Sequence, residues 1–306
     1  MNIPCRYSLL FLVIFFHLLL IPAKSIADLS QKQEGIVSIS LPDQLVKGFP
    51  SILKVNLSQF KGEIPIFSLF FDSADLKIHF QSVESKKLFV LCPIPFPNIS
   101  NDNGVDQGYS VSHTQAKPAY TRTMLVDLSS LGKSNCEKRT YFIDIPDGRY
   151  KIWAELPSIK TISDILEVEI LSANLTESAY QKELQTKLRL SPIRYAWNSS
   201  LFNNTIIPLA TNSEGIREQV FAQMQFHILL SNFLWGQGVN REELETLPVP
   251  DYLSIEKEMI LIYLDLEQGK NGSSEDFSAF IKSHPDLSWR MVDFNYLTIR
   301  KEFQKP

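Results

Sequence analysis

Residues 139–156 read Arg-Thr-Tyr-Phe-Ile-Asp-Ile-Pro-Asp-Gly-Arg-Tyr-Lys-Ile-Trp-Ala-Glu-Leu and contain two alternating runs around a Pro-Asp-Gly-Arg corner. Side chains of a strand repeat every two residues, so each run predicts a strand with one apolar face. Tyr141, Ile143 and Ile145 share the first face, and the second holds Tyr150, Ile152, Ala154 and Leu156. Pro, Asp and Gly between the runs favour a turn. The middle of the chain is therefore predicted to be β structure.

Further short strands are predicted on both sides of this stretch. Apolar residues alternate with polar ones, or run together, between turn residues. The segments are 36–41, 49–57, 64–71, 76–82, 87–92, 123–128 and 165–171. About seven to nine strands without an intervening helix are typical of an antiparallel β-sandwich. Residues Pro93–Ala119 have no regular pattern, and we expect a long surface loop there.

The pattern changes near Asn174, after which apolar residues recur at helical spacing. The expected helix starts are Thr176, a capping box at Thr211–Glu214, a second capping box at Asn240–Glu243, Pro250, Ser274, and a last stripe over 289–303. We therefore expect a multidomain chain, with a β-sandwich at 34–172 and an α-helical domain of about five helices at 173–306.

The first 27 residues have the layout of a secretory signal peptide. A positive charge at Arg6 precedes an almost wholly apolar run, Ser8–Ile21, and the segment ends at Ala27. An uncleaved membrane anchor is the alternative, but the run is shorter than the roughly 20 residues that cross a bilayer. We expect cleavage of residues 1–27 and a secreted or periplasmic protein whose mature chain has no membrane span.

The mature chain is expected to be acidic. Removal of Arg6 and Lys24 changes the net charge from −4 to −6, and the remaining Lys and Arg residues are scattered without a basic run. Nucleic acids and anionic membranes are bound by concentrated positive charge. Neither is therefore an expected partner.

Cysteine and asparagine residues point to modifications of an exported chain. Loss of the signal peptide leaves Cys92 and Cys136, and an even pair in an oxidising compartment predicts a disulfide. Two separate buried thiols are the alternative. Six Asn-X-Ser/Thr triplets begin at Asn56, Asn98, Asn174, Asn198, Asn203 and Asn271. They are glycosylation acceptors if the host glycosylates asparagine, and otherwise polar turns.

The sequence lacks a nucleophile elbow, a zinc-protease motif, a phosphate-binding glycine loop and a Cys-X-X-Cys motif. The histidines of the mature chain lie in four different segments, at His79, His113, His227 and His284. His113 lies near two serines, but no acid that would orient it can be assigned. The Asn101–Gly104 run lacks the acidic positions of a calcium loop and is interpreted as a solvated turn. We expect no catalytic residue, cofactor or metal.

One irregular stretch of the helical half is rich in aromatic residues. Tyr195, Trp197 and Phe202 lie among Asn and Ser residues without helical periodicity. Aromatic residues with polar neighbours can form a partner-binding surface. The alternative interpretation is that they fill the seam between the two domains.

The segment Asp147–Ile152 resembles the tyrosine-corner region of immunoglobulin-like sandwiches, in which a Tyr follows a turn and precedes a core position by two residues. That position is Cys in true immunoglobulin domains and is Ile152 here. The resemblance implies an immunoglobulin-like or macroglobulin-like module. It also implies that the chain crosses between sheets at this corner, so that residues 141–145 face Ile152 and Ala154 across the core rather than forming a hairpin with them.

The sequence favours an exported protein that acts through protein or ligand binding, or as a structural protein, without chemistry of its own. An extracytoplasmic hydrolase with a site dispersed along the chain is the first alternative. A protease-inhibitor-like module that uses the loop Pro93–Ala119 as bait is the second. Fold alone does not separate these functions, because sandwiches host many unrelated ones.

Overall fold

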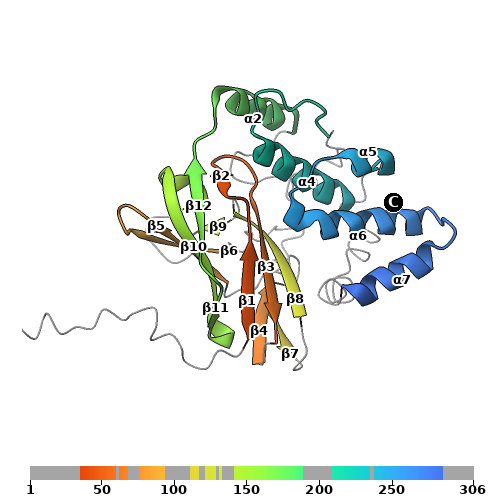
Figure 1. Cartoon of the computed structure of the whole chain (residues 1–306), viewed down its shortest axis with the longest axis horizontal. Coiled ribbons are helices and arrows are strands. Elements are labelled where there is room, and N and C mark those ends of the chain that lie inside the picture. Colours follow the sequence, from red (N-terminus) through yellow and green to blue (C-terminus); the bar gives the residue numbers. More distant parts are fainter. Residues whose placement is uncertain are drawn as a thin grey trace, which may run out of the picture. The chain divides into compact units, whose positions relative to one another are not determined.

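The computed structural model describes residues 35–59, 62–67, 76–93, 111–116, 121–128, 131–132, 141–188, 209–234 and 238–284. Residues 34–306 form one compact unit. Strands make up its amino-terminal part and helices its carboxy-terminal part, as predicted (Figure 1). The change from strands to helices occurs between Leu171 and Leu175.

The strands form two larger sheets and one separate pair. The three-stranded sheet has the order β1 (Ile36–Ser40), β3 (Ile52–Ser58), β8 (Thr121–Asp127). The seven-stranded sheet has the order β2 (Gln44–Val46), β12 (Leu166–Leu171), β10 (Gly148–Leu156), β5 (Lys77–Ser82), β6 (Leu88–Pro93), β9 (Leu131–Gly132), with β11 (Thr161–Ile162) paired to β10. The separate pair is β4 (Gly62–Phe67) and β7 (Val111–Ala116).

Two strand predictions need correction. The described strand pairs are antiparallel except β2–β12, which is parallel, and an isolated bridge between Val37 and Ser163 is parallel as well. A purely antiparallel arrangement is therefore wrong. The chain moves from the first sheet to the edge of the second between β1 and β2, where Pro42 cannot continue the ladder. The expected loop over Pro93–Ala119 contains strand β7. Its mostly polar sequence gives no alternation signal, and its register is set by backbone pairing with β4.

Both larger sheets contribute to one hydrophobic core. The buried side chains of the first sheet include Leu53, Val55 and Val126. Those of the second include the predicted inward face of β10, namely Tyr150, Ile152, Ala154 and Leu156. This part of the alternation argument is confirmed, because the alternate residues of β10 are all less buried.

Residues 141–145 do not form the predicted strand. Phe142–Asp144 is a 3₁₀ helix, and the Asp144 side chain accepts a hydrogen bond from the Tyr141 amide (2.7 Å). A turn of three residues places Phe142 and Ile145 on the same side, where both are buried, whereas Ile143 is 46% exposed. The hairpin is therefore ruled out and the predicted face is wrong. The crossing between sheets also occurs earlier, since β9 already belongs to the second sheet.

The described helices are α2 (Leu175–Leu188), α4 (Glu218–Leu234), α5 (Arg241–Thr246), α6 (Ser254–Glu267) and α7 (Ser273–Ser283), with short 3₁₀ turns η4 (Pro157–Ile159) and η5 (Asp251–Leu253). None of these helices combines the length and the apolar character needed to cross a membrane. The stripe predicted over 289–303 lies outside the described residues.

The predicted helix caps are partly right. Asn240 caps α5 by accepting a hydrogen bond from the Glu242 amide (3.0 Å). The cap of α2 is Asn174 rather than Thr176, because Asn174 and Glu177 exchange two hydrogen bonds in a capping box. Thr211–Glu214 does not cap α4, which begins only at Glu218.

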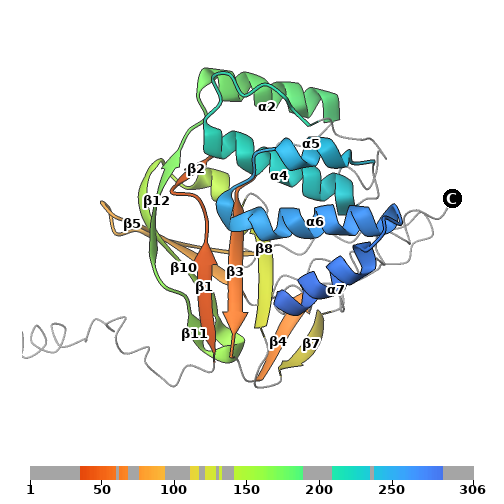
Figure 2. The same ribbon diagram turned by 45° about the vertical axis from the view of Figure 1, so that its right-hand side comes forward.

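Helix α4 lies at the centre of the helical half and against the strands (Figure 2). Every residue from Val220 to Leu230 is buried, as expected for a helix covered on all sides. One cluster joins α4 to Val46 and Phe49, and another joins α4, α6 and α7 to Ile52 of β3 and Leu125 of β8. Strand and helix residues on either side of the predicted boundary at 172/173 thus share these two clusters, and the division into two domains stays a prediction.

A polar network crosses the same seam. Lys54 of β3 is 7% exposed, and its Nζ lies 2.9 Å from Oε1 of Glu256, which is 1% exposed. Lys54 Nζ also donates to the Tyr252 carbonyl (3.1 Å). The Gln223 side chain accepts from the Ile52 amide (2.9 Å) and donates to the Tyr252 hydroxyl, which donates to the Ile52 carbonyl. The helices are thus fixed to one register of β3.

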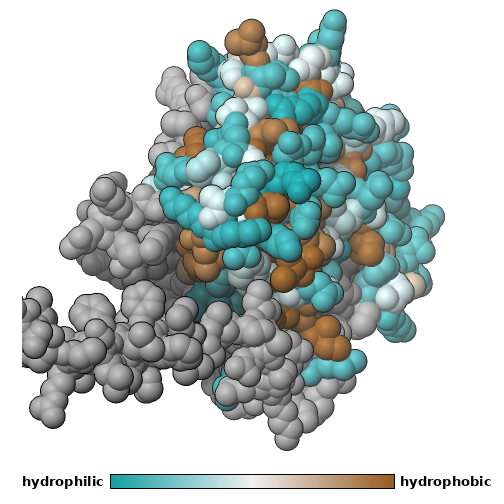
Figure 3. Space-filling model, turned by 60° about the vertical axis from the view of Figure 1, so that its left-hand side comes forward, coloured by the Kyte–Doolittle hydropathy of each residue, from teal (hydrophilic) through white to brown (hydrophobic). Residues whose placement is uncertain are grey.

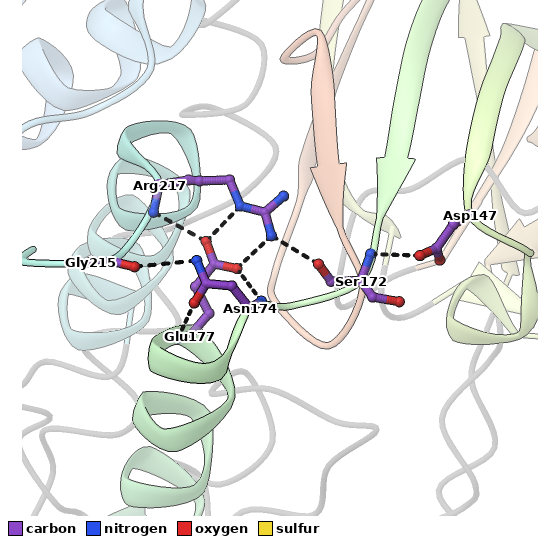
Figure 4. Close-up of polar contacts among 6 residues, drawn as sticks. All are labelled: Asp147, Ser172, Asn174, Glu177, Gly215 and Arg217. Carbon is purple, nitrogen blue, oxygen red and sulfur yellow. Dashed lines mark hydrogen bonds and ion pairs between the residues drawn. The ribbon is translucent and has the colours of Figure 1, made fainter.

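A second polar joint lies where β12 leads into α2 (Figure 4). Glu177 is fully buried and receives Arg217 Nε (2.9 Å) and Nη2 (2.7 Å) on its two carboxylate oxygens. Its oxygens also accept the amides of Asn174 (2.9 Å) and Arg217 (3.1 Å). Arg217 Nη2 donates further to the Ser172 carbonyl (2.8 Å). One carboxylate therefore joins the last strand, α2 and the segment that leads into α4.

Substitution Tyr150→Phe removes a single hydrogen bond, from the Tyr150 hydroxyl to the Pro146 carbonyl (2.9 Å). The free energy of unfolding should fall by about 1 kcal/mol, measured by urea denaturation. An unchanged midpoint with an unchanged denaturant slope would show that the bond contributes nothing.

Substitution Glu177→Gln leaves Arg217 without its counter-charge. We expect a loss of about 3 kcal/mol in unfolding free energy, as for removal of one partner of a buried pair. The matched control is Glu167→Gln, whose side chain is 60% exposed and 4.0 Å from Lys151, and which should cost less than about 0.5 kcal/mol. Equal losses in the two variants would contradict the assignment.

The same joint predicts a dependence on pH. Burial raises the pKa of Glu177, but the hydrogen bonds from Arg217 and two backbone amides outweigh it and bring the pKa below its ordinary value of 4.5. The unfolded chain then binds the proton first, so the stabilisation is complete above pH 4.5 and is lost as pH falls through the lower folded-state pKa. Urea midpoints followed through this window should fall more steeply for the wild type than for Glu177→Gln.

Candidate functional site

The outer face of the seven-stranded sheet carries a group of polar and aromatic side chains in mutual contact. On β10, Lys151, Trp153 and Glu155 alternate with the buried core residues and are only partly covered. Cross-strand pairing places His79 of β5 opposite Trp153 and Lys77 opposite Glu155. Since directly opposed residues share a face, these side chains form one group that points away from the core.

His79, Glu155 and Trp153 are in direct contact. His79 Nε2 lies 2.7 Å from Oε2 of Glu155. The imidazole stacks on the Trp153 ring, with centroids 4.8 Å apart and an interplanar angle of 5°. Lys77 Nζ is 3.7 Å from the other Glu155 oxygen. The stack and the hydrogen bond together hold the Trp153 ring in one orientation.

The surroundings of His79 favour its neutral form. Its side chain is 11% exposed, and this burial lowers its pKa more than Glu155 raises it. A carboxylate can only accept, so Nε2 carries the proton and donates it to Glu155. Nδ1 is buried and has no hydrogen-bond partner in the described part of the chain. The ring therefore acts as a donor and a stacking surface, with an unused acceptor.

The group offers little for covalent chemistry. Cys92 follows on the neighbouring strand β6, but burial raises the pKa of its thiol, which favours the unreactive protonated form. Among the residues that the structure describes, no three His, Cys, Asp or Glu side chains are grouped so that they could hold a metal ion. The arrangement is suited to positioning an aromatic side chain.

Of the two cysteines of the predicted disulfide, the structure describes Cys92 alone. Cys92 is partly buried and lies opposite Gly132 in the β6–β9 pair. Cys136 lies outside the described residues, so the disulfide stays a prediction.

Most other residues singled out from the sequence are outside the described ranges. These are Tyr195, Trp197 and Phe202 of the expected partner surface, and the Asn101–Gly104 turn. His113 is in β7, opposite Pro65 of β4. Of the two serines near it in the sequence, Ser112 is in the same strand and Ser110 lies outside the described residues. His227 lies in α4 and is 2% exposed, as expected of a buried residue.

Sequence reasoning missed the histidine–glutamate pair for a definite reason. The alternation over 76–82 already placed His79 with Lys77 and Gln81 on the polar face of β5. Glu155 is 76 residues away in the chain, and no local spacing connects the two. Strand pairing alone brings them together.

Exposed apolar residues occur at both sides of this group. Leu88 begins β6 and is 48% exposed, and Ile165, which precedes β12, is 43% exposed. Figure 3 shows the side of the molecule on which β10 and β12 lie in Figure 1, and brown hydrophobic patches alternate there with teal hydrophilic residues. Trp153 belongs to β10, which lies between β12 and β5 in the sheet.

Comparison with known proteins assigns no family. No family model matches the chain, and no curated protein matches it. Among solved structures, the β-glucosidase of Listeria innocua in complex with isofagomine is matched with a TM-score of 0.24 and 14% identity, over 45% of this chain and 16% of that one. A mutant of the same enzyme in complex with laminaribiose gives a TM-score of 0.24 and 14% identity, over 46% and 17%. Likeness at this level carries no argument about function.

Proposed function

We propose that this is an exported protein without chemistry of its own, which binds a protein partner through the outer face of the seven-stranded sheet around Trp153. The observation that carries the proposal is the His79–Trp153 stack with its hydrogen bond to Glu155. A partly exposed tryptophan held in one orientation loses little conformational entropy on binding. Tryptophan is also among the residues that dominate binding energy at protein interfaces.

The surroundings of Trp153 support a protein partner. Exposed Leu88 and Ile165 add apolar area near it, and Lys151, Lys77 and Glu167 add polar groups of both signs. An apolar centre with a polar, charged rim is typical of protein interfaces. Balanced charge gives no reason to expect a nucleic acid.

We propose further that residues 34–172 form an immunoglobulin-like or macroglobulin-like sandwich that presents this face. The hydrogen bond from the Tyr150 hydroxyl to the carbonyl four residues earlier supports this, since a tyrosine corner makes such a bond. The common core of the two sheets supports it as well. Export rests on the signal-peptide layout of residues 1–27, and the Cys92–Cys136 disulfide would fit the same destination.

A hydrolase is the second candidate, because His79 and Glu155 form a histidine–carboxylate pair at hydrogen-bond distance. In such a pair the carboxylate orients the base. The low exposure of His79 and the raised pKa of the neighbouring thiol weigh against this role. The bait-loop alternative concerns Pro93–Ala119, of which the structure describes only Pro93 and the strand β7 at Val111–Ala116.

Substitution Trp153→Ala should abolish partner binding. Crosslinked partners of the full chain, recovered from the compartment that receives it, would be compared between wild type, Trp153→Ala and Leu175→Ala. Leu175 is 91% exposed at the start of α2 and is a matched control for loss of an exposed apolar side chain. Partners retained by Leu175→Ala and lost by Trp153→Ala are expected, and retention by both would contradict the proposal.

Substitution His79→Ala tests whether the stack positions Trp153. We expect weaker partner binding together with increased mobility of the Trp153 ring. Ring mobility is measured by fluorescence anisotropy decay in a background in which the other tryptophans are replaced by Phe, with and without His79→Ala. Turnover on a hydrolase substrate panel that Glu155→Gln eliminates would instead support the second candidate. Unchanged ring mobility with unchanged binding would refute the positioning role.

A further inference from the structure

The turn between α6 and α7 contains the one described asparagine that is followed by glycine, Asn271–Gly272. Both residues are exposed. Gly272 has φ +80°, and an added Cβ would meet no atom within 4 Å. The same holds for Gly269, with φ +65°, three residues earlier. The backbone of this turn is therefore not covered by neighbouring side chains at either glycine.

The amide of Gly272 is also unengaged. The turn is closed by the Ser273 amide (3.1 Å) and the Ser273 hydroxyl (2.6 Å), which both donate to the Lys270 carbonyl. The Gly272 carbonyl accepts from the Asp276 amide (3.0 Å). Within the described chain, the Gly272 N–H donates to no acceptor, so it is available for reaction with the neighbouring side chain.

We infer that Asn271–Gly272 is a site of spontaneous deamidation and isomerisation in the folded protein. The Gly272 nitrogen attacks Asn271 Cγ, the new N–Cγ bond closes a five-membered succinimide, and the Cγ–Nδ2 bond breaks. Nδ2 leaves as ammonia and takes up the proton lost by the Gly272 amide. Water then opens the ring at Cγ to give aspartate, or at the main-chain carbonyl carbon to give isoaspartate. No oxidant or enzyme is required.

A second dipeptide of the same kind is an internal comparison. Asp147–Gly148 can form the same succinimide with loss of water, but its side chain is held. Asp147 Oδ2 accepts from the Ser172 amide (3.0 Å), and Oδ1 is paired with Lys47. Both carboxylate oxygens are therefore held by neighbouring groups in the folded chain, and unfolding releases them. The fold therefore protects one Xaa–Gly site and leaves the other open.

Modification at Asn271 would act on α7. Gly272 is the N-cap residue of this helix, which packs on α6 through contacts such as Phe277 with Tyr263. Isoaspartate routes the main chain through Cβ and Cγ and so adds one atom directly before the cap. We expect the first turn of α7 to open more often, because its hydrogen bond to Gly272 requires the present backbone geometry.

The test follows the modification site by site. The full chain is produced in a host that does not glycosylate asparagine, since a glycan on Nδ2 would block loss of ammonia. Folded wild type and Asn271→Gln are incubated in mildly alkaline buffer at physiological temperature, beside wild type unfolded in urea. Isoaspartate is labelled by enzymatic methylation and located by peptide mapping with mass spectrometry. The map also distinguishes residue 271 from Asn103–Gly104, a second Asn–Gly pair that lies outside the described residues.

The folded wild type should accumulate aspartate and isoaspartate at residue 271 and no isoaspartate at residue 147. The Asn271→Gln variant should give no modified peptide at residue 271. The unfolded chain should be modified at both sites. Hydrogen exchange of the aged protein should be faster in α7 than that of the aged Asn271→Gln control. An unmodified Asn271 in the folded chain, during a period in which the unfolded chain is modified there, would overturn the inference. If isoaspartate formed at residue 147 as fast in the folded chain as in the unfolded chain, the argument for protection would be overturned.

Discussion

The described structure depends most on the burial of Lys54, a charged residue in the middle strand of the three-stranded sheet. β3 is covered on both faces, since Leu53, Val55 and Leu57 enter the core between the sheets while Ile52 and Lys54 face the helices. A lysine in this position needs a counter-charge and hydrogen bonds, because an unpaired buried charge costs several kcal/mol. Glu256 and the Tyr252 carbonyl supply them from η5 and α6.

This constraint gives the seam specificity more than stability. Apolar contacts between α4, α6 and the sheet tolerate small shifts, but a buried ion pair and the Gln223 contacts do not. Glu177 and Arg217 act similarly at the start of α2, where the Glu177 carboxylate accepts hydrogen bonds from Asn174 and from Arg217. The strand and helical halves are therefore joined by polar contacts of fixed geometry set in apolar surroundings, which is consistent with a single cooperative unit over residues 34–306.

The same fold leaves one sheet face for other uses. The inner face of β10 is wholly apolar and buried, while its outer face carries Trp153 and Glu155, and β5 contributes His79 beside them. Burial lowers the pKa of His79 and so favours the neutral ring, which donates a hydrogen bond to Glu155 and stacks on Trp153. The two Xaa–Gly sites also differ in their surroundings. Asp147 is held by Ser172 and Lys47, whereas Asn271 is exposed.

Local patterns in the sequence determined the inward face Tyr150–Leu156, the cap at Asn240 and the change from strands to helices near Asn174, because each depends on residues only a few positions apart. Tertiary structure decided the rest. Residues 141–145 alternate like a strand, yet Phe142–Asp144 form a 3₁₀ turn, which lets both Phe142 and Ile145 reach the core. Lys54 meets Glu256 across 202 residues and His79 meets Glu155 across 76. No spacing rule reaches so far, since such partners are chosen by the pairing and packing of whole elements rather than by the local chain.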